Sequence, residues 1–125
     1  MRLNLFLAVL IITSLSCSKN KDDKTVVKYE VLGTSPEGYD AAYTNELGLT
    51  SNLRVFSGWT FEITGEKGKC YTLTIIPYLN CDSSGTINIY INNKLQASKF
   101  VLSFNETVPD PFGRPNCGIS QTACN

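Results

Sequence analysis

The stretch TINIYIN, residues 86–92, places an isoleucine at every second position and a polar or aromatic residue between them. This period of two is the pattern of a strand with one buried and one exposed face. Isoleucine and tyrosine also suit a pleated sheet surface. The Asn-Asn-Lys sequence at 92–94 follows at once and predicts a tight hairpin. We therefore expect a strand here, with a second strand folding back beside it.

The same alternation recurs in both directions along the chain. Six further runs show it, at residues 25–32, 38–44, 52–55, 59–64, 70–76 and 99–105. Turn-forming sequences separate them: GTSPEG at 33–38, NELG at 45–48, GEKG at 65–68 and DSSG at 82–85. No segment has a 3.6-residue apolar period. The pattern predicts an all-β fold, an Ig-like antiparallel β-sandwich of about seven strands, with a small barrel as the related alternative.

Alternation also assigns the aromatic side chains to faces. Trp59 and most tyrosines fall on the apolar face of their strands and are expected in the core. In the last run, Phe100, Leu102 and Phe104 are expected to share the apolar face. Tyr90 has the opposite parity and is expected to face outward. It is either an exposed contact residue or a side chain resting on a neighbouring strand.

The chain begins with one arginine and an apolar run of about ten residues, half of what a membrane-spanning helix needs. We interpret residues 1–16 as a cleaved signal peptide, the alternative being a buried strand or helix of the domain. Ser14-Leu15-Ser16-Cys17 resembles a bacterial lipoprotein processing box, with serine where leucine is commonest. The resemblance implies that Cys17 is acylated and becomes the mature N-terminus.

Residues 17–25 then form a polar tether without an apolar side chain before Val26. The sequence CSKNKDDK resembles the start of Bacteroidetes-type lipoproteins, which implies an outer membrane lipoprotein facing the periplasm or the cell surface. A simple charged spacer is the alternative. The remaining chain divides into a β-sandwich domain at 26–108 and a cysteine-containing extension at 109–125.

The mature domain resembles the MmpS-type family of accessory proteins of membrane exporters. The resemblance covers about residues 26–95 and lies in VVKYEVLG, AAYTNELG, SGWTFEI and TINIYINNK. It implies an Ig-like sandwich outside the cytoplasm that works beside a transport pump. The family carries no catalytic residues to transfer. Two features depart from it: the lipid anchor in place of a transmembrane helix, and the extension DPFGRPNCGISQTACN.

Four cysteines remain once Cys17 is set aside, and exported chains form disulfides. Cys70 and Cys81 lie at opposite ends of a strand, too far apart for a disulfide. Because successive antiparallel strands run in opposite directions, the tail is expected to start near Cys81 and to end near Cys70. This favours the pairs Cys81–Cys117 and Cys70–Cys124, which would fix the tail as an added strand. A local Cys117–Cys124 loop is the rival. A zinc site is disfavoured because the spacings lack a knuckle.

Composition narrows the function. The chain has no histidine and equal numbers of basic and acidic residues, 11 of each. Nucleic acid is therefore not an expected partner, and the commonest general base and metal ligand is missing. We expect no cofactor, no metal site and no catalytic residue. An enzyme would have to use paired carboxylates, and the available ones are expected in turns or on solvent-facing positions: Glu37, Glu62, Glu66, Asp82 and Asp110.

These observations favour a lipid-anchored envelope protein that acts as a non-catalytic binding or accessory module, with an envelope protein, such as a membrane transporter, as its partner. The alternative is an adhesion or inhibitor domain displayed on the cell surface. Sandwich folds serve all of these roles, so the fold alone does not choose between them.

Overall fold

The structure, a computed structural model, describes residues 24–78, 81–103 and 117–125. In these ranges the chain forms eight strands and no helix. They are β1 (Lys24–Gly33), β2 (Tyr39–Thr44), β3 (Thr50–Val55), β4 (Trp59–Glu66), β5 (Cys70–Pro77), β6 (Gly85–Ile91), β7 (Lys94–Val101) and β8 (Ile119–Cys124). The expected signal peptide, acylated Cys17 and most of the tether lie outside the described residues, as do Phe104 and Asp110.

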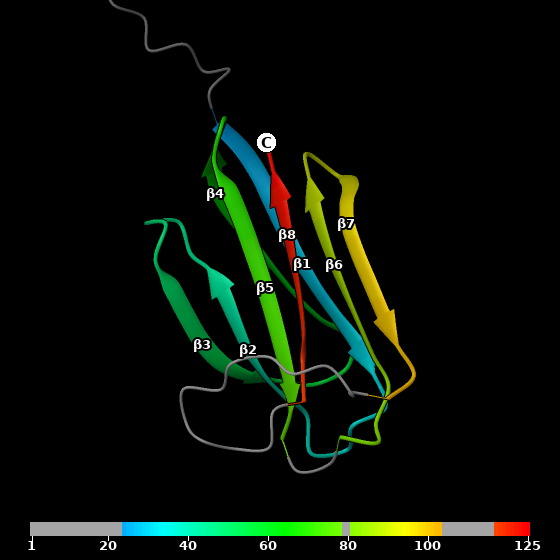
Figure 1. The fold of residues 1–125 in the computed structure, drawn as a ribbon. Coiled ribbons are helices and arrows are strands. Elements are labelled where there is room, and N and C mark those ends of the chain that lie inside the picture. Colours follow the sequence, from blue (N-terminus) through cyan, green and yellow to red (C-terminus); the bar gives the residue numbers. More distant parts are fainter. Residues whose placement is uncertain (1–23, 79–80, 104–116) are drawn as a thin grey trace, which may run out of the picture.

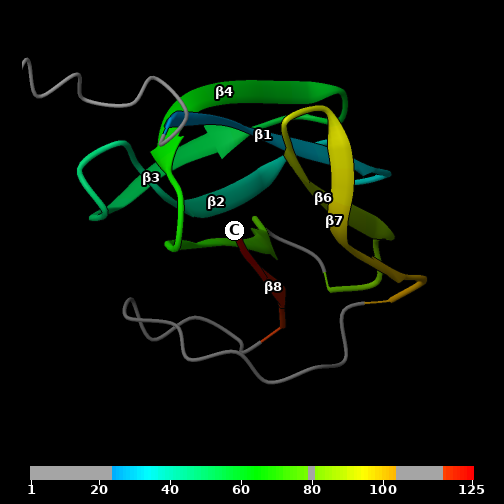
Figure 2. The same ribbon diagram turned by 90° about the horizontal axis from the view of Figure 1, so that it is seen from above.

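Two antiparallel sheets pack face to face (Figures 1 and 2). One has the strand order β4-β1-β6-β7 and the other β3-β2-β5-β8. The all-β antiparallel sandwich expected from the sequence is confirmed. The eighth strand, β8, comes from the C-terminal extension and pairs with β5 along its whole length. The described part of the extension thus contributes an integral strand to the second sheet.

The core lies between the two sheets and is built from the predicted apolar faces. Every second residue of β1, β5 and β6 is buried, so the period-two assignment is correct for these strands. The largest fully buried side chains come from both sheets: Tyr29, Tyr39, Leu73, Ile75, Ile87, Ile89 and Ile119. Burial of these side chains is the main favourable term in folding.

The β6–β7 hairpin turns through the predicted Asn-Asn pair. Asn92 and Asn93 have φ values of 50° and 64°. Two consecutive residues with positive φ characterise the type I′ turn, whose twist matches that of the flanking strands. Asn92 also joins this hairpin to β1, since its Oδ1 accepts a hydrogen bond from Val26 N–H at 3.0 Å. The turn therefore positions the first strand as well as connecting two others.

The prediction for the apolar face of β7 is wrong. Phe100 is 59% exposed and Leu102 is 77% exposed, whereas Ala97 is buried. Ala97 lies opposite the buried Ile89, and a register shift follows at the next position of the ladder. This pairing turns the odd-numbered residues at the end of β7 inward, so the phenylalanine faces solvent although its own sequence pattern is apolar.

Trp59 and the neighbouring Phe61 are less buried than expected. Trp59 is half-buried, and Phe61 is 41% exposed. Both lie on β4, an edge strand. They stack with ring centroids 6.0 Å apart, and both also contact the ring of Tyr43 from the other sheet. The rings therefore cover the border of the core on this side.

Candidate functional site

The outer face of the β4-β1-β6-β7 sheet carries Tyr90, the residue expected to face outward. Tyr90 lies on β6, is half-buried and points away from the core, as its parity predicted. The Lys28 ammonium lies 4.3 Å from the centroid of its ring, a cation–π contact. The phenol donates a hydrogen bond to Glu30 Oε1 at 3.1 Å. Tyr90 thus rests on β1 and still presents part of its ring to solvent.

A chain of polar side chains continues from Tyr90 across three strands. Asn88 Nδ2 donates to the same Glu30 oxygen at 2.7 Å, and Ser98 Oγ donates to Asn88 Oδ1 at 2.6 Å. The pairing register brings Glu30, Asn88 and Ser98 into one row across β1, β6 and β7. Such connected networks hold their side chains in defined orientations.

The network also controls the ionisation of Tyr90. Partial desolvation, followed by the hydrogen bond to Glu30 and the charge of that carboxylate, raises the pKa of Tyr90 above its usual value. The phenol therefore keeps its proton, and its hydrogen bond to Glu30, to a higher pH than an ordinary tyrosine. Sequence reasoning found Tyr90 and missed Glu30 and Ser98, because neither stands out until the strands beside them are known.

Exposed apolar side chains lie on both sides of this polar row, in the neighbouring rows along the strands. On one side Leu95 is opposite Tyr90 and is 53% exposed. On the other side Leu32 and Phe100 flank Thr86 and are 40% and 59% exposed. We call the surface formed by these residues the Tyr90 face: Lys28, Glu30, Leu32, Thr86, Asn88, Tyr90, Leu95, Ser98 and Phe100. Fixed polar groups flanked by exposed apolar ones are typical of protein-binding surfaces.

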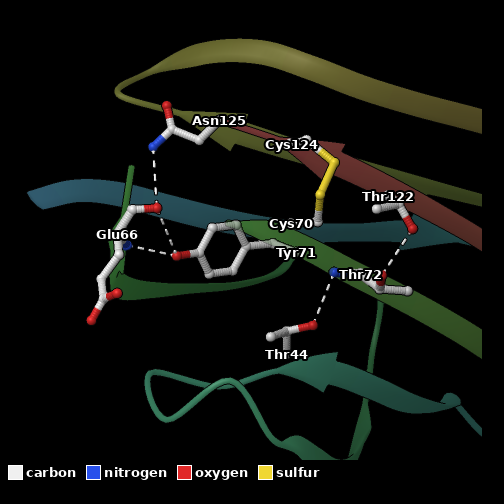
Figure 3. The surroundings of a disulfide bond; sticks show 8 residues. All are labelled: Thr44, Glu66, Cys70, Tyr71, Thr72, Thr122, Cys124 and Asn125. Carbon is white, nitrogen blue, oxygen red and sulfur yellow. Dashed lines mark hydrogen bonds between the residues drawn. A yellow bond between two sulfur atoms is a disulfide. The ribbon is translucent and has the colours of Figure 1, made fainter. Parts of the chain in front are cut away.

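A concave feature lies at the end of the sandwich where β1 begins. A cleft of about 440 Å³ opens between the β2–β3 hairpin and the β4–β5 turn, with Tyr71 and Cys70 in its wall. The Tyr71 hydroxyl accepts a hydrogen bond from Glu66 N–H at 2.6 Å, and Figure 3 shows this phenol directed at the Glu66 backbone. The hydroxyl is therefore engaged in holding the turn.

The two disulfides join Cys70 to Cys124 and Cys81 to Cys117. This is the pairing favoured from the sequence, and it excludes the local Cys117–Cys124 loop. Because all four sulfurs are used in disulfides, they are not available as zinc ligands. Figure 3 shows the first bond at the end of the β5–β8 ladder.

The carboxylates considered for catalysis are solvent-exposed wherever the structure describes them. Glu37, Glu62, Glu66 and Asp82 are all exposed. Glu62 and Glu66 both lie on β4, whereas Glu37 and Asp82 lie in two separate loops. In the described ranges no group of three or more histidine, cysteine, aspartate or glutamate residues is placed to hold a metal ion. The expectation of a non-catalytic protein remains a prediction.

Within the part of the chain that the structure describes, no helix is long and apolar enough to cross a bilayer. No family model matches the chain, and no curated protein matches it either. The resemblance to MmpS-type proteins therefore remains a prediction from the residues that carry it.

Proposed function

We propose that this chain is a lipid-anchored envelope protein and that its β-sandwich is a non-catalytic binding module with the Tyr90 face as its contact surface. The observation that carries the proposal is the hydrogen-bonded row from Tyr90 through Glu30 and Asn88 to Ser98. The buried Asn88 holds Glu30 and Ser98 in place, and these two side chains and Tyr90 are already ordered on an accessible sheet face. A partner that binds them loses little side-chain entropy, which favours affinity.

The chemistry of this face suits a protein partner. Tyrosine is enriched at interfaces because its ring is apolar and its hydroxyl forms hydrogen bonds. Leu95 adds exposed apolar surface opposite Tyr90, and Phe100 adds more on the other side of the polar row. Lys28 and Glu30 supply one charge of each sign, which selects for complementary charges in the partner.

The anchor is the second part of the proposal. Acylation of Cys17 would hold the domain at a membrane. Stable attachment needs two or more acyl chains, which a di- or triacylated cysteine provides. The resemblance to MmpS-type proteins suggests that the partner is an envelope protein such as a membrane transporter. An adhesion or inhibitor domain on the cell surface is the alternative. Protease treatment of intact cells distinguishes the two, because the protease digests a domain on the cell surface and does not reach one in the periplasm.

The contact surface is tested by placing a photo-crosslinking amino acid at Tyr90 in cells. We expect a crosslink to a defined envelope protein. The matched control is the same amino acid at Asn52, an exposed residue of β3 in the other sheet. Tyr90→Ala should abolish co-purification of that partner, and Tyr90→Phe should weaken it by removing the hydrogen bond to Glu30. Equal crosslinking at both positions, or none at Tyr90, would contradict the proposal.

The anchor is tested by metabolic labelling with a fatty acid analogue. The wild-type protein should incorporate label and fractionate with membranes, and Cys17→Ser should do neither. Cys81→Ser is not a suitable control because that residue forms a disulfide. Ser18→Ala serves instead, since it changes the neighbouring residue and keeps the thiol. Labelling of the Cys17→Ser protein would overturn the anchor.

A further inference from the structure

One end of the sandwich gathers several turns around the point where the described chain begins. Figure 1 shows the start of β1, the C-terminus, and the β4–β5 and β6–β7 turns at this end. The β2–β3 hairpin belongs to it as well, because Glu46 Oε1 accepts a hydrogen bond from Thr64 N–H near the end of β4, at 3.1 Å. We call this the tether end.

The β2–β3 hairpin presents two leucines to solvent. Leu47 is 82% exposed and Leu49 is 62% exposed. The loop is nevertheless well ordered, because Asn45 Oδ1 accepts hydrogen bonds from the N–H groups of both leucines at 3.0 Å. Asn45 Nδ2 in turn donates to Ser51 Oγ at 2.9 Å. Two apolar side chains are thus displayed on a braced loop.

Exposed lysines lie at the same end of the sandwich as this hairpin. The tether end carries four exposed lysines. Its negative charges are two exposed glutamates, Glu46 and Glu66, and the C-terminal carboxylate. Two further exposed carboxylates, Glu37 and Asp82, lie in loops of the opposite end. The four lysines are Lys24, Lys67, Lys69 and Lys94. Long lysine side chains at the same end as exposed leucines match the surface of an anionic bilayer, where the ammonium groups reach the phosphates and the leucines reach the acyl region.

The length of the tether restricts which end can approach a membrane. Seven residue steps separate Cys17 from Lys24, so the tether spans at most about 25 Å when fully extended. The ten-residue strand β1 is roughly 33 Å long, which sets the distance between the tether end and the opposite end. Because the tether is shorter than the sandwich, an acyl chain on Cys17 keeps the tether end within about 25 Å of the bilayer and excludes an upright orientation with the opposite end on the membrane.

We infer that the tether end docks on the anionic surface of the bilayer, with Leu47 and Leu49 entering the interface and the lysines contacting lipid phosphates. This inference rests on the proposed lipid anchor. In this orientation the strands stand upright, and the Tyr90 face is directed sideways, toward proteins that project from the same membrane. A protein partner for the leucine hairpin is the competing occupant.

The test uses the acylated protein, purified from membranes, verified by the mass of its Cys17 peptide and reconstituted into phosphatidylcholine–phosphatidylglycerol vesicles containing brominated acyl chains. A tryptophan is introduced at the hairpin by Leu47→Trp, with Trp59→Phe to remove the native indole. The matched control is Leu102→Trp, because Leu102 is similarly exposed and lies beyond the other end of β7. We expect a blue shift and bromine quenching for Leu47→Trp only.

A second measurement uses the unaltered acylated protein. Acetylation of amines should be slower at Lys67 and Lys69 on anionic vesicles than on neutral ones, and unchanged at Lys99, which lies near the other end of β7. This readout does not depend on how well the tryptophan variants fold. It also reports the lysines separately from the leucines.

The outcomes separate the two proposals. Quenching of Leu47→Trp with slower acetylation supports the inference. An acylated, vesicle-attached protein that shows neither effect overturns this inference alone, as does quenching that appears only when a protein partner is added. Absence of acyl mass on Cys17 overturns the proposed function and this inference with it.

Discussion

Cys70 and Cys124 lie directly opposite each other at the end of the β5–β8 ladder, with their α-carbons 4.0 Å apart, and a disulfide joins them. The next residue, Asn125, connects this point to the other sheet, since its Nδ2 donates to Thr25 Oγ1 at 3.1 Å. Its backbone also pairs with Gly68 and Lys69 of the β4–β5 turn. The disulfide therefore holds the C-terminal strand, the turn and the first strand together.

Removing this disulfide by Cys70→Ser with Cys124→Ser should destabilise the protein. The bond closes a loop with a sequence separation of 54. The second disulfide, Cys81–Cys117, lies inside this loop and shortens it in the unfolded chain, so we expect a loss of about 2–4 kcal/mol, the typical range for one disulfide. Urea denaturation should show this loss, and hydrogen exchange should show faster exchange in β8 than in β1.

The adjacent hydroxyl pair provides the control. Thr72 Oγ1 and Thr122 Oγ1 are 2.8 Å apart on the same two strands, in an exposed position. Replacing both by valine should cost less than about 1 kcal/mol, because cross-strand pairs contribute only that much. A disulfide variant no less stable than this control would show that pairing with β5, and not the disulfide, fixes β8.

Tyr29→Phe should change the pH dependence of stability. Burial raises the pKa of Tyr29 above its usual value of about 10, and its hydroxyl donates to Thr44 O at 2.7 Å. The stability that this group contributes is fully present below pH 10. It is lost as pH rises from 10 to the higher native pKa, because in that range the phenol ionises only in the unfolded chain. At pH 8 the variant should be less stable by about 0.5–1.5 kcal/mol.

Above pH 10 the difference between wild type and Tyr29→Phe should narrow, since phenylalanine does not titrate. Urea unfolding at pH 8 and pH 11 measures both differences under conditions that affect the other tyrosines and lysines equally. A difference that stays constant between the two pH values would mean that the Tyr29 phenol ionises as easily in the folded protein as in the unfolded one.

Much of the fold follows from local sequence patterns. Alternation identified the buried faces of β1, β5 and β6, and the Asn92-Asn93 pair identified the tight hairpin. The disulfide pairing followed from counting strand directions, because antiparallel strands carry their ends up and down in turn. These features depend on neighbours in sequence or on simple geometry.

The remaining features depend on pairing between distant strands. Phe100 was assigned to the wrong face because a register shift in the β6–β7 ladder decides which side of β7 is buried. Glu30 and Ser98 join Tyr90 only through side-chain contacts across three strands. Neither effect leaves a local signal, so sequence reasoning found one residue of the Tyr90 face and not its network.

Asn92→Gly and Asn93→Gly should have different effects although both keep the turn. Glycine adopts positive φ at no cost, so the turn conformation survives in each variant. Asn92→Gly also removes the acceptor for Val26 N–H and should cost about 1 kcal/mol. Asn93→Gly should be nearly neutral. Thermal and urea unfolding of the two variants provide the comparison, and equal losses would contradict a role for the Asn92 side chain in holding β1.

Gly33→Ala should be strongly destabilising for a steric reason. A Cβ at this position would overlap the Tyr39 hydroxyl and lie 2.5 Å from Ser84 O. Tyr39 cannot easily move, because its hydroxyl donates to that same carbonyl and accepts a hydrogen bond from Ser35 N–H at 3.1 Å. Overpacking of this kind typically costs about 1–3 kcal/mol.

Gly48→Ala gives the matched comparison, because its cost has a different origin. No atom lies within 4 Å of a Cβ added at Gly48, but its φ is +75°. The expected loss is about 1–2 kcal/mol from the left-handed backbone alone. Tyr39→Phe should therefore reduce the cost of Gly33→Ala, since it removes the overlapping hydroxyl, and should leave the cost of Gly48→Ala unchanged. A double-mutant cycle by urea denaturation measures both couplings, and equal couplings would rule out the overlap with the Tyr39 hydroxyl as the reason for glycine at position 33.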